Sequence, residues 1–139
     1  MQTIGADTSS SLGTVDIYTS HEGLLLEYEQ SLTRKLRDPS DGSKPKWFNT
    51  SAHFIWIGDR TRQLGGAHVE YFRGIENPIG IKIGPTMSSE ELPRLLDIVN
   101  PKKEIGKVTL ITRYGAEKIK DLLPAHIKAV KGSGHVVVW

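Results

Sequence analysis

Charged side chains follow several short apolar segments of this chain, and most of these side chains are basic. The apolar segments are residues 15–18, 53–57, 79–83 and 108–112. The charged residues at the ends of the last three are Asp59, Arg60, Arg62, Lys82 and Arg113. In a parallel α/β sheet, ligands bind at the carboxyl ends of the strands. Repeated cations at that edge are typical of an anion pocket for phosphate and carboxylate groups. The sequence therefore predicts a phosphorylated, acidic small-molecule substrate.

Lys82 is the most informative of these cations, because it lies within the apolar run IGIKIG. In a strand, Lys82 points away from the face to which Ile81 and Ile83 contribute. If the isoleucines pack against helices, Lys82 points into the interior on the other side of the sheet. A cation there is costly unless an anion compensates it. Arg60 and Arg62, each taken alone, are more typical of a solvated helix surface.

Strand-like and helix-like periods alternate along the chain after a polar lead at residues 1–13. The predicted strands are residues 14–19, 53–57, 79–83, 107–112 and 136–139. The predicted helices are residues 24–37, 61–73, 88–99 and 116–131. Ser88 and Glu91 match a capping box at the start of the third helix. Residues 38–46, rich in Pro, Gly, Ser and Asp, are predicted to form a loop.

This order requires a parallel sheet with helical crossovers, which we assign to one domain over residues 14–139. An open doubly wound sheet and part of a (β/α)8 TIM-type barrel both fit the order. A complete barrel typically needs about 250 residues, and this chain has 139. The last predicted strand also ends at the final residue. We therefore expect a truncated chain, with five sequential strands and helices on one face.

Composition narrows the class of protein only broadly. The formal net charge is +2, with 18 basic and 16 acidic residues, and this balance does not favour nucleic acid as a partner. There is no apolar stretch near the length of a membrane span and no secretory signal pattern at the N-terminus. The chain contains no cysteine, which excludes disulfides and thiolate chemistry within these residues. We expect a cytoplasmic location; a plastid form would need a transit peptide.

The histidines do not form a convincing metal site in the sequence. His21 and Glu22 are adjacent, so their side chains point apart in a strand. His68 and Glu70 form an equally weak pair. We expect His53 to lie in the core with its ring nitrogens hydrogen-bonded.

Three segments resemble one enzyme family, the class II (plant-type) 3-deoxy-D-arabino-heptulosonate 7-phosphate synthases. The segments are residues 17–34, 47–85 and 108–139, and the long motif WIGDRTRQLGGAHVEYFRGIENPIGIK carries most of the likeness. The resemblance implies a (β/α)8 barrel, of which the strands here resemble the third to seventh. It also implies condensation of phosphoenolpyruvate with erythrose 4-phosphate, the first step of the shikimate pathway to aromatic amino acids.

The resemblance further implies roles for individual residues. Phosphoenolpyruvate would be bound by the pair Asp59–Arg60, by Lys82 and by Arg113; many relatives have Glu at the position of Asp59. The family uses a divalent metal of the manganese or cobalt type, held by Cys, His, Glu and Asp. None of these metal ligands can be placed on this sequence, so we expect the 139 residues alone to bind no metal and to lack synthase activity.

Two classes of function therefore stay open. The first is a transferase of aromatic biosynthesis acting on phosphoenolpyruvate and erythrose 4-phosphate. The second is a non-catalytic partial barrel that retains an anion site. A doubly wound nucleotide-binding domain is a poorer third choice, because TSHEGLLLEYE is not a glycine-rich phosphate loop. Unpaired strand edges would also allow association into homo-oligomers.

Overall fold

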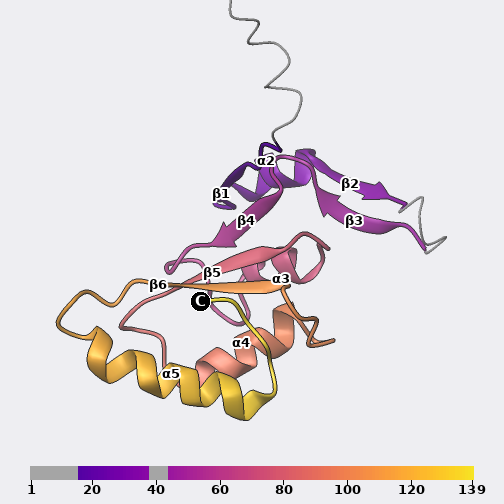
Figure 1. The fold of residues 1–139 in the computed structure, drawn as a ribbon. Helices are drawn as coiled ribbons and strands as arrows, with labels where there is room; N and C mark the ends of the chain where they lie inside the picture. The colour runs from indigo at the N-terminus through magenta and orange to yellow at the C-terminus, as the bar shows by residue number, and fades with distance from the viewer. Residues whose placement is uncertain (1–15, 38–43) are drawn as a thin grey trace, which may run out of the picture.

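A computed structural model describes residues 16–37 and 44–139, and its centre is a parallel sheet of four strands. The strands lie in the order β1-β4-β5-β6, and each pair of neighbours is parallel. Their bounds are Ser20–Glu22, Phe54–Ile57, Ile79–Ile83 and Val108–Thr112. The predicted parallel α/β architecture is confirmed, and the parallel pairing puts every carboxyl end at one edge (Figure 1).

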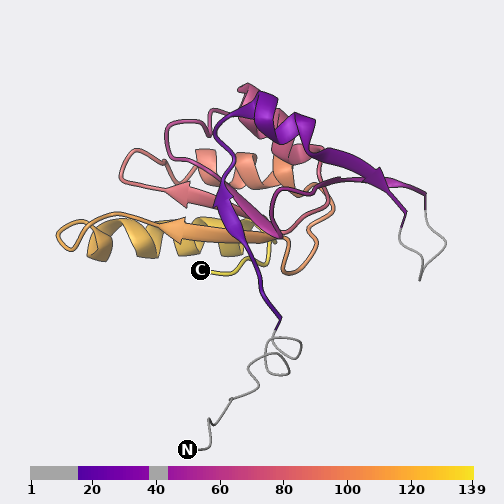
Figure 2. The ribbon, with the colours of Figure 1, turned by 90° about the horizontal axis from the view of Figure 1, so that it is seen from above.

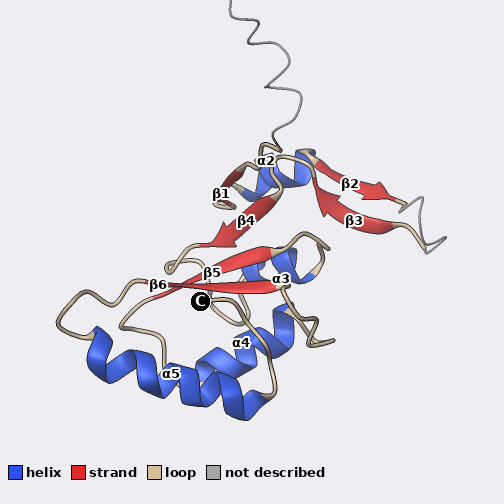
Figure 3. Ribbon diagram, in the orientation of Figure 1, coloured by secondary structure: helices blue, strands red, loops and turns tan. Residues whose placement is uncertain are grey.

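One face of the sheet is covered by three helices, α3 (Ala67–Arg73), α4 (Glu91–Val99) and α5 (Ile119–Ser133). Helix α4 contacts both α3 and α5, and all three lie on the same side of the strands (Figures 1 and 3). Ile79, Ile81 and Ile83 are fully buried towards this side. The stripe predicted for α4 is buried as well, and consists of Leu92, Leu95, Leu96 and Val99. Burial of this apolar area is the main source of the fold's stability.

The ends of the helices follow local signals in part. The Ser88 hydroxyl accepts a hydrogen bond from the Glu91 backbone N–H at 3.0 Å, as half of a capping box. In a complete capping box the Glu91 carboxylate would also accept from the Ser88 backbone N–H; here it accepts from Arg62. Helix α5 ends at Gly134, whose φ of 76° is the left-handed conformation typical of a C-terminal stop. Helix α3 begins at Ala67, later than predicted, because residues 61–66 form turns.

The region between the first strand and β4 differs from the prediction. In place of one helix over residues 24–37, the structure has a short helix α2 (Leu26–Ser31) followed by strand β2 (Thr33–Leu36). Strand β2 pairs antiparallel with β3 (Lys46–Asn49), of which Lys46 was predicted to be loop. This hairpin projects away from the central sheet (Figures 1 and 2). The helical prediction was wrong there because pairing with a strand distant in sequence overrides the local period.

The first and last predicted strands are also displaced. Residues 14 and 15 lie outside the described residues, and residues 16–19 are not in a strand. Strand β1 begins at Ser20, because the register with β4 places Ser20 opposite Phe54 and Glu22 opposite Trp56. At the other side, the run 136–139 forms an isolated parallel bridge between Val138 and Thr109 of β6. The Val138 N–H donates to Val108 at 3.0 Å, so this run lies where a fifth strand was predicted.

The closed barrel itself stays a prediction, because the described strands form an open sheet. Among the helices of the described residues, none is long and apolar enough to cross a membrane.

Candidate functional site

A cavity of about 280 Å³ lies at the carboxyl edge of the sheet. Its lining includes three of the four site residues predicted from the sequence, each from a different strand end: Asp59 after β4, Lys82 in β5 and Arg113 after β6. Ile83, Gly84 and Pro85 complete the lining. The Arg113 backbone N–H donates to the Ile83 carbonyl at 2.9 Å, which extends the β5–β6 pairing up to the cavity. The parallel register therefore brings these charges together, as parallel pairing requires.

Lys82 lies on the face of the sheet opposite the helices. Its neighbours Ile81 and Ile83 are fully buried on the helix side, and Lys82 is half-buried. The Lys82 ammonium lies 5.5 Å from the centroid of the Trp56 ring, a cation–π distance. Gly80 allows this crowding, since a Cβ there would lie 2.8 Å from the Cβ of Trp56. The orientation predicted from the IGIKIG run is thus the one observed.

The two arginines of the GDRTR segment have different positions. Arg60 is exposed, does not line the cavity, and its backbone carbonyl accepts a hydrogen bond from Gln63 at 2.8 Å. Arg62 is only 6% exposed, so the expectation that it belongs to a solvated surface was wrong. The Arg62 Nε donates to the Asp59 carboxylate at 2.9 Å. The acidic partner at i−3 was the one sequence signal for this pair.

Two further groups at this edge were missed from the sequence. Tyr114, directly after Arg113, is buried, and burial raises its pKa to about 12. Its hydroxyl lies 2.5 Å from His126 Nδ1, and His126 Nε2 lies 3.0 Å from the Met87 carbonyl. A carbonyl only accepts, so Nε2 carries the proton and Nδ1 accepts from the tyrosine. This tautomer leaves both buried groups satisfied.

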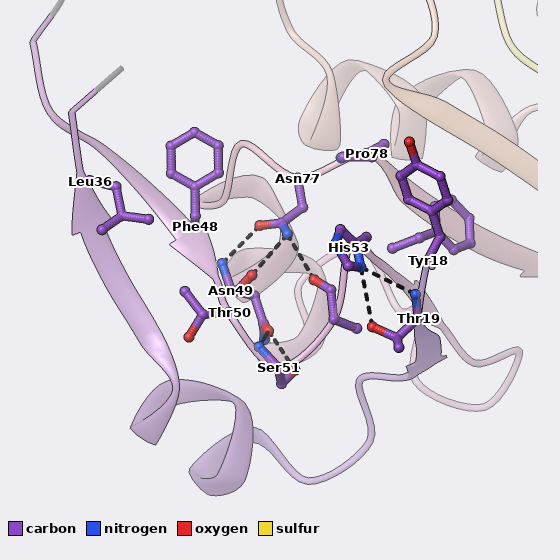
Figure 4. A pocket seen from close by; sticks show the side chains of 12 residues that line it. Tyr18, Thr19, Leu36, Phe48, Asn49, Thr50, Ser51, His53, Asn77 and Pro78 are labelled. Carbon is purple, nitrogen blue, oxygen red and sulfur yellow. Dashed lines mark hydrogen bonds between the residues drawn. The ribbon is translucent and has the colours of Figure 1, made fainter. Parts of the chain in front are cut away.

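A second cavity, of about 700 Å³, lies at the opposite, amino edge of the sheet (Figure 4). Phe48, His53, Asn77 and Pro78 are among its lining residues, and that lining contains no Asp, Glu, Lys or Arg among the described residues. His53 is exposed rather than in the core, and Tyr18 packs edge-on against it with the ring centroids 5.3 Å apart. Its Nδ1 does accept a hydrogen bond, from the Thr19 backbone N–H at 3.2 Å.

Beside the amino edge, a buried carboxylate joins the hairpin to the sheet. Glu29 of α2 is 2% exposed and accepts hydrogen bonds from His21 at 2.7 Å and Asn49 at 2.6 Å. The Ser51 hydroxyl donates to the same carboxylate at 2.8 Å. Burial alone would raise the pKa of Glu29, but the hydrogen bonds from Asn49, His21 and Ser51 outweigh burial and hold the pKa below its ordinary value. His21 thus pairs with Glu29 rather than with Glu22.

The described residues do not offer a site for the divalent metal. Within residues 16–37 and 44–139, no group of three or more His, Cys, Asp or Glu side chains is arranged to hold a metal ion. We therefore assign no metal ligand to this part of the chain.

The fold and the cavity define an α/β protein with two cationic side chains lining a cavity at the carboxyl edge of a parallel sheet. Comparison with known proteins gives the family: the model of the class-II DAHP synthetase family matches residues 1–139, and the chain belongs to that family. DAHP is 3-deoxy-D-arabino-heptulosonate 7-phosphate.

Two curated relatives are similar to the chain over most of its length. A phospho-2-dehydro-3-deoxyheptonate aldolase of Neurospora crassa is 58% identical over 150 aligned positions, which cover 100% of this chain and 31% of the relative. A probable chloroplastic phospho-2-dehydro-3-deoxyheptonate aldolase of Catharanthus roseus is 47% identical over 128 positions, covering 92% of this chain and 25% of the relative. The chain thus spans between a quarter and a third of the relatives' length.

Proposed function

We propose that this chain provides the phosphoenolpyruvate-binding edge of a synthase that condenses phosphoenolpyruvate with erythrose 4-phosphate. The product would be 3-deoxy-D-arabino-heptulosonate 7-phosphate, at the first step of the shikimate pathway. Family membership supports the reaction, and one observation supports the role of this segment. Lys82 and Arg113, on adjacent strands, line one cavity of about 280 Å³ together with Asp59.

The chemistry of phosphoenolpyruvate fits these residues. The molecule carries a carboxylate and a phosphate close together, so it needs two cations at a short spacing. In the β5–β6 register Lys82 lies opposite Ile111, so Arg113 is two residues further along the neighbouring strand, and both side chains reach the same cavity. Arg113 offers a planar fork for two oxygens, whereas Lys82 offers a movable point charge. Donors fixed in a partly dry site stabilise developing charge better than water does.

Arg60 has a less direct place in this proposal. It lies at the same strand end, and its side chain is exposed. It would contribute by swinging towards a bound phosphate, and its neighbour Asp59 would hold a water or a cation beside the substrate. The divalent metal, of the manganese or cobalt type, belongs to the complete enzyme, and we route no step through it here.

A non-catalytic anion-binding module is the second candidate, and the same cavity favours it. Anion binding needs only Lys82 and Arg113, which this chain contains, whereas turnover needs the metal as well. Association through the edges of the open sheet is a further proposal, since within the described residues β1 and the Val138 bridge each have a strand neighbour on one side only. The cytoplasmic location also stays a prediction, because one relative is named chloroplastic.

The test is titration of phosphoenolpyruvate into the 139-residue chain by calorimetry, for the unsubstituted chain and for Lys82→Ala and Arg113→Ala. Each substitution should raise the Kd at least about tenfold, because it removes a cation that faces the anion. Lys128→Ala, on the exposed side of α5, is the matched control and should leave the Kd unchanged. Equal Kd values in all four proteins would contradict the proposal. Product formation with erythrose 4-phosphate and added Mn²⁺ then separates the two candidates, and we expect none from this chain alone.

A further inference from the structure

The inference concerns Arg62, a buried guanidinium directly behind the anion cavity. A buried guanidinium is tolerated only when its N–H groups have partners. In Arg62, Nε donates to Asp59 at 2.9 Å and Nη2 donates to the Thr86 hydroxyl at 2.9 Å. Nη1 lies 3.3 Å from a Glu91 carboxylate oxygen and 3.6 Å from the Met87 sulfur. The partners come from the segment after β4, the segment after β5 and the first turn of α4.

The contact with Asp59 changes the charge that an anion meets in the cavity. Asp59 is the one carboxylate among the lining residues, and it would repel a phosphate there. Its Arg62 partner offsets that negative charge from the side away from the cavity. Asp59 is also held flat against Gly84, since a Cβ at Gly84 would lie 3.3 Å from both carboxylate oxygens. Lys82 and Arg113 are then left to act on the anion.

The contacts with Thr86 and Met87 fix the segment that forms one wall of the cavity. Residues 84 and 85 line the cavity, and Thr86 and Met87 follow directly. Met87 is 3% exposed, and its backbone N–H donates to the Gly84 carbonyl at 3.1 Å. Its own carbonyl accepts from His126, which in turn accepts from Tyr114, the neighbour of Arg113. Buried hydrogen bonds therefore connect the three strand ends that surround the cavity.

From these contacts we infer that Arg62 is a positioning residue for the anion site. It neutralises Asp59 and fixes the wall at residues 84–87, so that the cavity is preorganised before the anion arrives. This inference deepens the proposed function and rests on it for the identity of the anion. All four Arg62 contacts are to groups of the protein itself, so the positioning role can be measured separately from binding.

The charge role is tested with Arg62→Gln, Asp59→Asn and the double variant in the 139-residue chain, using inorganic phosphate and phosphoenolpyruvate as probes. Arg62→Gln should weaken binding of both about tenfold, because the Asp59 carboxylate is then uncompensated. Adding Asp59→Asn should restore most of the affinity. Arg73→Gln is the matched control: Arg73 also pairs with a carboxylate at i−3, Glu70 at 2.8 Å, but on an exposed face of α3.

Two results would overturn the charge role: unchanged affinity in Arg62→Gln, or a double variant that binds as weakly as the single one. The positioning role is tested by hydrogen exchange without any anion. Amides of residues 84–90 should exchange faster in Arg62→Gln and not in Arg73→Gln, and equal exchange would overturn it. If Arg62→Gln fails to fold, Arg62→Lys keeps the charge without the fork, and should retain affinity while exchange still speeds up. Absence of binding by the unsubstituted chain would count against the proposed function, and the exchange result would still decide the role of Arg62.

Discussion

The two edges of the same sheet treat their cations in opposite ways. At the amino edge, Lys107 donates from its ammonium to the carbonyls of Ile75 and Asn77, each at 2.7 Å. Burial lowers the pKa of Lys107, and both bonds are to backbone groups. At the carboxyl edge, the side chains of Lys82 and Arg113 form no hydrogen bond or ion pair within the described part of the chain. One edge uses its cation to complete the fold, and the other has two cations that line a cavity.

The difference shows that burial and charge alone do not mark a binding site. Lys107 is half-buried like Lys82, but carbonyls already satisfy it. The larger cavity, about 700 Å³ at the amino edge, has no Asp, Glu, Lys or Arg in its described lining, whereas the smaller one has Asp59, Lys82 and Arg113. Cavity volume and cationic lining therefore favour different edges of the sheet. The informative feature is a cation beside a cavity that forms no hydrogen bond or ion pair within residues 16–37 and 44–139.

The largest expected effect on stability comes from a substitution in β5, in the middle of the sheet between its two edges. In Gly80→Ala the new Cβ would lie 2.8 Å from the Phe54 ring and from the Cβ of Trp56, which cannot move without its strand. The free energy of unfolding should fall by about 3 kcal/mol. Urea denaturation measures it, with Gly65→Ala as the control, since a Cβ at Gly65 meets no atom within 4 Å. An equal loss of unfolding free energy in the two variants would show that close packing around Gly80 does not determine the stability of the sheet.

A smaller loss of stability is expected when the attachment of the β2–β3 hairpin is weakened, with the cavity at the carboxyl edge left intact. Glu29→Gln removes the carboxylate that accepts from His21, Asn49 and Ser51, and should cost about 2 kcal/mol at neutral pH. Because the folded pKa of Glu29 is lowered, its stabilisation is present above the ordinary value of 4.5 and is lost as the pH falls through the folded pKa. The stability difference between the two proteins should therefore shrink in acid.

Unfolding in urea at neutral and acidic pH measures this difference, and Glu27→Gln, exposed on the same helix, is the control. Phosphate affinity should be unchanged in Glu29→Gln. Loss of that affinity would mean that the two edges are not independent.

The smallest expected loss of stability concerns Tyr114 and His126, the buried hydrogen-bonded pair near the carboxyl edge. Tyr114→Phe leaves His126 Nδ1 without a donor and should cost about 1 kcal/mol. In the unsubstituted chain, one tyrosine should ionise at about 12, and its stabilisation should decline as the pH rises from the unfolded value of 10.0 through about 12. Ultraviolet titration of tyrosinate measures this, and the late transition should be missing in Tyr114→Phe. A late transition that persists in the variant would assign it to another tyrosine.

The sequence predicted the elements whose apolar residues are continuous or strictly periodic. Strands β4, β5 and β6 are buried on the helix side, and α4 has a regular apolar stripe, so local pattern and tertiary burial agree. Strand ends and parallel register then placed Asp59, Lys82 and Arg113 around one cavity.

The elements that depend on contacts between different segments of the chain were not predictable in this way. Strand β1 is polar because His21 bonds to a carboxylate of α2, and β2 exists because β3 lies beside it. The burial of Arg62 depends on Thr86 and Glu91, more than twenty residues away. Short-range periodicity contains no information on such contacts.

One small feature of the amino edge bears on how the protein ages. The Asn77 side chain imitates a peptide group: its Oδ1 accepts from the Asn49 N–H at 2.8 Å, and its Nδ2 donates to the Asn49 carbonyl at 2.9 Å. Deamidation would replace the donating amide with a carboxylate and break the hydrogen bond from Nδ2 to the Asn49 carbonyl. That reaction proceeds through a ring closed by the backbone N–H of the following residue. Here that residue is Pro78, which has no N–H. The connection between β3 and the central sheet is therefore chemically protected against spontaneous hydrolysis of its amide by this route.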